Sequence, residues 1–344
     1  MKIQRPRQSK QRRGSQLEGS QGTASVSQSP SEAQLIAVLS REFSQGVGQQ
    51  VSVGIGDDAA VLRFSGNLVV SVDGQVEGTH FRREWLSLGE IGYRSFQAAI
   101  SDLAAMGAVP VGAVSHLTLP RRFSGAELRR LTRGQAQAAQ ETACPVVGGN
   151  LSRGAELSVV TTVLGRATRC LRRSGARPGD ELWLVGEVGL ARAGLELLAS
   201  ESALRSASAR RALRRWRRPR ALLAAGRALV GKAHACLDVS DGLARDAQNL
   251  ASASGVRVDI HAEKLEGALS ADLIRLARSL GLSPLALACE GGEDYALLAS
   301  GPRRRRPTEA KLIGAVSAGE GAFLVEDGAS KPLSGGFDHF GVDG

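Results

Sequence analysis

Acidic residues at the ends of apolar segments are the main chemical signal of this sequence. Asp57 and Asp58 stand side by side within residues 51–62, where Gly54 and Gly56 predict a bend between two strands. Two adjacent carboxylates repel each other, so they are stable when fully solvated or when they face a cation. The pair alone leaves both a solvated loop and a metal site open.

Further acidic residues recur at similar positions along the chain. Asp73 follows residues 68–72, which are typical of a buried strand, and Asp102 lies near the end of an expected helix. Asp238 and Asp241 lie at the end of another short apolar segment. Carboxylate oxygens suit Mg²⁺, which keeps several waters and is usually shared with substrate phosphates. The pattern predicts a carboxylate-lined cleft that holds Mg²⁺ against a nucleotide.

These acids must be positioned by alternating strands and helices. In the first part of the chain we expect a helix after Ser31, strands at 51–55, 59–64, 68–72, 111–119 and 156–166, and helices at 89–106 and 124–142. A turn cluster at 173–180 marks a boundary. Beyond it we expect strands at 181–185, 256–260 and 294–299, and helices at 190–199, 219–230, 243–253 and 271–280. The prediction is an α/β or α+β protein with a tail at 1–30 and domains at 31–168 and 169–344.

Composition limits the class of protein. The 344 residues suffice for two domains, and the net charge of +10 is concentrated in the amino-terminal tail, at 210–220 and at 303–306. Solvated basic segments are the simpler interpretation, and contact with RNA or with phosphates stays open.

The sequence also bears on cellular location. The four cysteines show no CxxC spacing, no apolar run is long enough to span a membrane, and the amino terminus lacks a secretory signal. We therefore expect a cytoplasmic protein.

Other polar motifs are ambiguous by themselves. Residues 148–150, Gly-Gly-Asn, follow a short strand and could either approach a phosphate or form a plain turn. Glu293, in a Gly-Gly-Glu-Asp-Tyr motif, could bind a substrate or belong to a turn, and His80 could be structural or functional. The tryptophans Trp85, Trp183 and Trp216 are isolated in the sequence, which favours a packing role.

Eight motifs taken together resemble a known family. They occur in order at 54–62, 70–81, 100–108, 148–150, 173–180, 238–243, 291–295 and 336–340. The residues of these motifs are similar to those of thiamine-monophosphate kinase, a member of the aminoimidazole-ribonucleotide-synthetase-like superfamily. The resemblance covers about 32–340 and leaves out the basic tail and the arginine-rich insertions.

The resemblance implies a fold and a reaction. The fold would be an amino-terminal α/β domain that forms a homodimer through its strands, followed by a carboxy-terminal α+β domain, with ATP held between them. The reaction would transfer the γ-phosphoryl group of ATP to thiamine monophosphate, giving thiamine diphosphate and ADP. Phosphoryl transfer needs positioning and charge stabilisation, so several Mg²⁺ ions on carboxylates, with no protein general base, agree with the acidic pattern.

The resemblance also implies residue roles. Mg²⁺ would be bound by Asp58, Ser71, Asp73, Asp102, Asp238 and Asp241. ATP would be contacted by Gly149, Asn150, Arg173 and Ser240. Thiamine monophosphate would be contacted by His80 and Glu293.

Three positions depart from the family pattern. Asn150 replaces an aspartate, Val72 and Gly74 replace threonines beside Asp73, and the place of an aromatic residue that stacks on thiamine is taken by Ser334 or Gly335. Two alternatives therefore stay open: a relative acting on another phosphate or acid, and a non-catalytic relative that binds a nucleotide or RNA. Selenophosphate synthetase and the hydrogenase-maturation dehydratase are disfavoured, because this chain has no cysteine before residue 51 or at its end.

Overall fold

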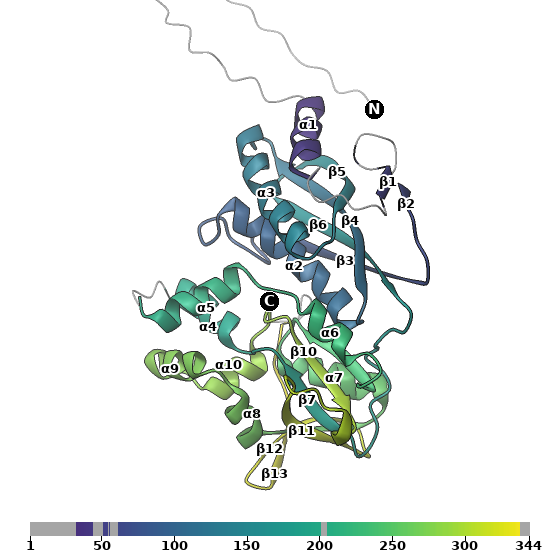
Figure 1. Cartoon of the computed structure of the whole chain (residues 1–344). Helices are drawn as coiled ribbons and strands as arrows, with labels where there is room; N and C mark the ends of the chain where they lie inside the picture. Colours follow the sequence, from purple (N-terminus) through teal and green to yellow (C-terminus); the bar gives the residue numbers. More distant parts are fainter. Residues whose placement is uncertain (1–31, 44–50, 54, 56–60, 201–204, 338–344) are drawn as a thin grey trace, which may run out of the picture.

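The computed structural model describes residues 32–43, 51–53, 55, 61–200 and 205–337 (Figure 1). The chain forms two parts, each built on its own sheet, and the two parts are stacked on each other. The tail at 1–30, Ser31 and the acidic pair at 57–58 lie outside the described residues.

The first part is a four-stranded sheet covered by helices. Its elements are α1 (Glu32–Phe43), β1 (Val51–Val53), β2 (Val61–Leu62), β3 (Asn67–Val76), α2 (Leu88–Ala105), β4 (Val109–Pro120), α3 (Gly125–Glu141), β5 (Val146–Gly154) and β6 (Ser158–Ala167). The sheet order is β3-β6-β4-β5, with β4 and β5 parallel, and β1 and β2 form a separate pair. Capping boxes at Ser87 and Ser124 begin α2 and α3.

The second part is a seven-stranded sheet with helices around it. Its elements are β7 (Glu181–Val185), α4 (Leu190–Ala199), α5 (Ala207–Arg217), α6 (Leu223–Leu229), β8 (Ala235–Val239), α7 (Leu243–Ser254), β9 (Arg257–His261), α8 (Ala262–Ala268), α9 (Ala271–Leu280), α10 (Pro284–Glu290), β10 (Ala296–Gly301), a 3₁₀ turn (Arg303–Arg305), β11 (Lys311–Ser317), β12 (Gly321–Glu326) and β13 (Ala329–Pro332). The order is β13-β12-β9-β11-β7-β10-β8. We keep the domain boundary after residue 168 as a proposal; it falls between the two sheets.

Most of the expected elements are present, and three differences from the expectation concern β5, the arginine run and two additional helices. The strand ending at Val147 continues to Gly154, so the glycine pair at 148–149 lies inside β5. The arginine run forms helix α5, with Trp216 in its last turn. Helices α8 and α10 were not predicted.

Strand β3 was expected to be buried, and that expectation is wrong for one of its faces. Val69 packs into the core with Phe96 and Ile100, whereas Leu68, Val70 and Val72 are 53%, 55% and 63% exposed. Successive side chains of a strand point to opposite faces, and in β3 only the face toward α2 is covered. The sequence pattern is apolar on both faces, which is why it suggested complete burial.

Helix α2 joins the two parts. Its carboxy-terminal residues Ala104 and Ala105 pack in one apolar cluster with Trp183 and Leu229 of the second part. The side chain of Ser101, on the same helix, donates a hydrogen bond to Asp238 on β8. The end of α2 therefore brings acidic residues of both parts to one place.

Candidate active site

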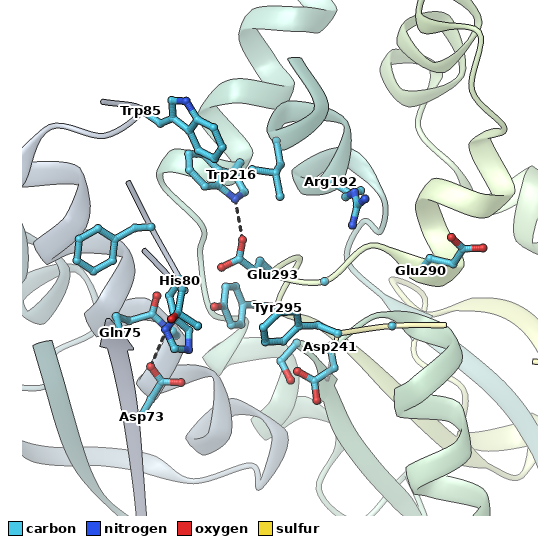
Figure 2. Close-up of a pocket in the computed structure, with 18 of the residues that line it drawn as sticks. Asp73, Gln75, His80, Trp85, Arg192, Trp216, Asp241, Glu290, Glu293 and Tyr295 are labelled. Atoms are coloured by element: carbon cyan, nitrogen blue, oxygen red, sulfur yellow. Dashed lines mark hydrogen bonds between the residues drawn. The ribbon is translucent and has the colours of Figure 1, made fainter. Parts of the chain in front are cut away.

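A cavity of about 820 Å³ lies where the two parts meet. Residues from β3, the end of α2, α4, α5, the turn after β8 and the segment before β10 line it (Figure 2). Segments far apart in the sequence therefore supply one pocket, which has both acidic and aromatic side chains in its wall.

Four of the predicted metal ligands share this pocket. Asp73 lies in β3, Asp102 near the end of α2, Asp238 in β8 and Asp241 in the turn that follows. The hydroxyl of Ser71 donates to Asp102, and that of Ser101 donates to Asp238 Oδ2 at 2.6 Å. Separate elements thus present their carboxylates to one space, as the sequence pattern predicts.

Burial disfavours ionisation of Asp73, Asp102 and Asp238, and repulsion by neighbouring charge adds to this effect at Asp73 and Asp238. Burial, reinforced by the charge of Asp102, raises the pKa of Asp238 to about 7. Burial also raises the pKa values of Asp102 and Asp73, and the charge of Asp102 adds to the rise at Asp73. Crowded buried carboxyls of this kind are stabilised by a cation.

The turn that carries Ser240 and Asp241 is held by another buried acid. Asp246, in the first turn of α7, accepts hydrogen bonds from the backbone N–H groups of Ser240 at 3.1 Å and Asp241 at 3.2 Å. Burial, followed by the charges of Asp238 and Asp241, raises the pKa of Asp246 to about 7. This contact fixes the direction in which the turn faces the pocket.

The segment before β10 has an unusual backbone. Glu293 and Tyr295 adopt left-handed φ angles of 64° and 49°, a region that residues other than glycine rarely occupy. Their N–H groups donate to Ser240 O at 2.8 Å and to Val239 O at 2.9 Å. A side chain on Gly292 would place its Cβ 2.4 Å from Ser240 O. This segment, which could have been a plain turn, is a wall of the pocket, and strain of this kind is typical of functional sites.

Glu293 is held between two side chains from different parts. Its Oε1 pairs with the guanidinium of Arg94 on α2, and its Oε2 accepts the indole N–H of Trp216 at 2.7 Å (Figure 2). Trp216 in turn packs edge-to-face on Trp85, with ring centroids 6.2 Å apart. The wall beside Glu293 is therefore aromatic.

The remaining predicted residues lie at different distances from this pocket. His80, Ser240 and Glu293 line it, whereas Ser71 and Arg173 act on Asp102, the first by a hydrogen bond and the second by its charge. Gly149 and Asn150 do not line it: they lie on β5, separated from β3 by β6 and β4. Asp58 lies outside the described residues.

Gly149 has a structural reason to lack a side chain. A Cβ there would lie 1.9 Å from the backbone oxygen of Ser115 on the paired strand β4. Asn150 forms a 3.0 Å side-chain contact with His116 Nδ1. The close approach of two strands, rather than a turn, thus explains the bare backbone at 149.

The chain matches a known protein family over most of its length. The model of the AIR synthase related protein, N-terminal domain, matches residues 56–167, and that of its C-terminal domain matches residues 177–326. The thiamine-monophosphate kinase of Aquifex aeolicus (strain VF5) is 35% identical over 289 residues, which are 83% of this chain and 92% of the relative. The chain belongs to the thiamine-monophosphate kinase family. The resemblance drawn from the eight motifs is confirmed.

Two further comparisons agree with this family. The thiamine-monophosphate kinase of Mycobacterium tuberculosis (strain ATCC 25618 / H37Rv) is 35% identical over 330 residues, 92% of this chain and 95% of the relative. The solved structure of AaThiL complexed with AMPPCP and TMP is 33% identical with a TM-score of 0.75, and the match covers 90% of this chain and 97% of that chain. The predicted two-domain fold is therefore confirmed.

Several pocket residues of this family member were missed by sequence reasoning. The packing role expected for Trp85 and Trp216 is confirmed, because both belong to one apolar cluster, but both also line the pocket in contact with each other. Other examples are Gln75, Arg192, Glu290, Tyr295 and Phe337. A tryptophan inside an arginine run is unusual for a solvated helix face, and that was the available signal for Trp216.

The pocket of this kinase family member offers carboxylate oxygens, the donor type that Mg²⁺ prefers. Among the residues that the structure describes, no group of three or more His, Cys, Asp or Glu side chains could hold a metal ion. Mg²⁺ is usually held by one or two carboxylates and completed by waters and substrate phosphates. Acids from three elements with raised pKa values and facing one pocket fit that mode of binding.

Proposed function

We propose that this protein is a thiamine-monophosphate kinase, transferring the γ-phosphoryl group of ATP to thiamine monophosphate to give thiamine diphosphate and ADP. One observation supports this most: Asp73, Asp102 and Asp238, from separate elements of both parts, face one pocket whose other wall is aromatic. Such a pocket suits a substrate with a phosphate at one end and flat rings at the other. Family membership makes it a phosphotransferase that uses ATP.

The acidic residues supply the electrostatics of the transfer. We propose Asp58, Asp73, Asp102, Asp238 and Asp241 as Mg²⁺ ligands, with Ser71 orienting Asp102. Mg²⁺ held by these residues would neutralise charge on the phosphates. The protein's own contribution is to bring two anionic reactants together in line. No side-chain base is required, because a phosphate oxygen of the acceptor is already ionised near neutral pH.

The other predicted contacts form part of the same proposal. Ser240, Arg173, Gly149 and Asn150 are proposed to contact ATP, and His80 and Glu293 the acceptor. His80 Nδ1 accepts the backbone N–H of Val76 at 3.1 Å, which orients the imidazole at the pocket. Asn150 keeps an oxygen where the family has a carboxylate, so we expect weaker Mg²⁺ binding there.

We also propose that the protein is a homodimer that pairs through the first sheet. The apolar row Leu68, Val70 and Val72 is more than half exposed on the uncovered face of β3, and an exposed apolar row of this kind marks a contact surface. A cytoplasmic location is part of the proposal, supported by four unpaired cysteines. No helix in the described part of the chain is long and apolar enough to cross a membrane.

The function is tested by incubating purified protein with ATP, Mg²⁺ and thiamine monophosphate and measuring thiamine diphosphate by chromatography. Product that requires all three components supports the proposal. Its absence at saturating substrates, from a chain with a cooperative unfolding transition, refutes it. Asp259→Asn is a suitable control, because the Asp259 carboxylate pairs with Arg257 at 2.7 Å and does not line the pocket.

A further inference from the structure

Arg94 is a buried cation placed directly behind the wall of the pocket. Its side chain is 1% exposed and does not line the pocket, yet it pairs with the carboxylate of Glu293, which does. Its other guanidinium nitrogen, Nη1, donates to Trp216 O at 3.1 Å, and the guanidinium lies 4.6 Å from the centre of the Trp216 ring. A buried charge is stable only when it is paired, so Arg94 requires Glu293 as an anion.

Trp216 completes the support of Glu293 from the other side. Its indole N–H donates to Oε2 of Glu293 at 2.7 Å, while Arg94 binds Oε1. Two donors on the two oxygens fix both the position and the rotation of the carboxylate plane. Each carboxylate oxygen carries a second acceptor position, so Glu293 can still accept a hydrogen bond from a ligand in the pocket.

The backbone shows that this arrangement is imposed. Glu293 has a φ of 64°, which a side-chain-bearing residue adopts only when its surroundings enforce it. Asp294, next in the chain, is fully buried and accepts the N–H groups of Gly189 at 2.6 Å and Ala191 at 3.1 Å. Contacts on both sides thus direct Glu293 toward the pocket.

We propose that Arg94 and Trp216 are positioning residues that hold Glu293 to accept a hydrogen bond from the amino group on the pyrimidine ring of the acceptor substrate. This inference rests on the proposed function, because thiamine monophosphate carries that amino group. The acids Asp73, Asp102 and Asp238 take the phosphate end, and the aromatic wall of Trp216 and Trp85 lies beside Glu293. Arg94 and Trp216 therefore determine specificity for an amino-bearing ring.

The test compares two Trp→Phe variants. Trp216→Phe removes the N–H that holds Glu293 and keeps an aromatic ring. Trp183→Phe is the matched control, because Trp183 is fully buried and donates its indole N–H to Glu181 at 3.0 Å outside the pocket. Initial rates are measured against thiamine monophosphate and against ATP, with thermal midpoints for both variants.

We expect Trp216→Phe to raise the KM for thiamine monophosphate roughly tenfold, the size expected when an oriented hydrogen bond to a charged group is lost, while kcat and the KM for ATP change less than about twofold. Trp183→Phe should leave both KM values unchanged. Arg94→Lys keeps the charge but not the second donor to Trp216, so it should give an intermediate rise.

A substrate analogue separates positioning from general damage. In the analogue, a hydrogen atom replaces the amino group of the pyrimidine, so Glu293 has no N–H group to accept and gains nothing from being held in place. The rise in KM caused by Trp216→Phe should disappear with this analogue. Two results overturn the inference when the unaltered chain is active: an equal rise in KM for both substrates, or an unchanged KM for thiamine monophosphate. If the unaltered chain forms no thiamine diphosphate, the proposed function itself fails, and this substrate assignment fails with it.

Discussion

Replacing Asp238 by asparagine is expected to stabilise the metal-free protein at neutral pH while abolishing turnover. Asp238 is 4% exposed and lies beside Asp102. Asparagine keeps the oxygen that accepts the Ser101 hydroxyl and adds an N–H₂ group that can donate to a neighbouring carboxylate. The substitution therefore removes charge from the site at little cost in packing.

The magnitude follows from the pKa. Burial raises the pKa of Asp238 from its ordinary 3.8 to about 7, and each pKa unit corresponds to about 1.36 kcal/mol, so ionising this carboxyl in the folded protein costs on the order of 4 kcal/mol. The substitution removes this cost, but part of the gain in stability is lost because a neutral amide accepts a weaker hydrogen bond from Ser101. A gain of roughly 1–3 kcal/mol in the free energy of unfolding is expected at pH 7.5.

The sign of the pH dependence is opposite to that of a salt-bridged acid. The folded protein retains the Asp238 proton at pH values where the unfolded chain has lost it, so the unfolded chain binds fewer protons. The free energy of unfolding of the unaltered protein should therefore fall as pH rises from about 4 to about 7 and level off above. The charge of Asp238 also contributes to the raised pKa of Asp246. Removing that charge should therefore also weaken the contribution of Asp246 to the pH dependence of the free energy of unfolding.

The assay is urea unfolding in EDTA at pH 4.5 and pH 7.5. The stability of Asp238→Asn relative to the unaltered chain should increase between these two pH values, whereas that of Asp259→Asn should stay constant. Added Mg²⁺ with ATP should stabilise the unaltered chain and have little effect on Asp238→Asn. A variant that is less stable than the unaltered chain at pH 7.5 without metal would refute the reasoning, as would a difference that does not vary with pH.

The remaining predictions concern the metal site and the proposed dimer. Asp102→Asn should abolish thiamine diphosphate formation without lowering the thermal midpoint; a folded variant with full activity would exclude Asp102 from the reaction. Asn150→Asp should lower the Mg²⁺ concentration that gives half-maximal rate, and an unchanged requirement would show that position 150 is not a ligand. Val70→Lys should yield monomers in light scattering, because it places charge in the exposed apolar row, while Ile274→Lys, on α9 at 36% exposure, should leave the mass unchanged. Equal masses for both variants and the unaltered chain would exclude that surface as the interface.

Local sequence signals determined most of the secondary structure. Helices α2 and α3 begin at serines followed three residues later by glutamate, and their apolar positions repeat with helical spacing. The acids at 73, 102, 238 and 241 could be selected because each follows or ends an apolar segment in a basic chain. Hard oxygen ligands at the ends of apolar segments are a pattern that a single sequence shows.

Contacts between distant residues could not be obtained this way. Residues 68–72 of β3 are mostly apolar, which does not show which face is buried. Helix α2 packs on the face that carries Val69 and leaves Val70 exposed on the opposite face. Gly149 suggested a phosphate contact or a turn, while its bare backbone is explained by the approach of β4. In both places the deciding neighbour lies more than twenty residues away.

The pocket itself depends on tertiary structure. Arg94, Trp216 and Glu293 are separated by more than seventy residues, and no spacing in the sequence relates them. They meet because α5 and the segment before β10 pack against α2, where a buried cation requires an anion. The sequence alone determined which chemistry is available, since side-chain type is a local property. Only the fold decided which side chains act together, because that depends on long-range packing.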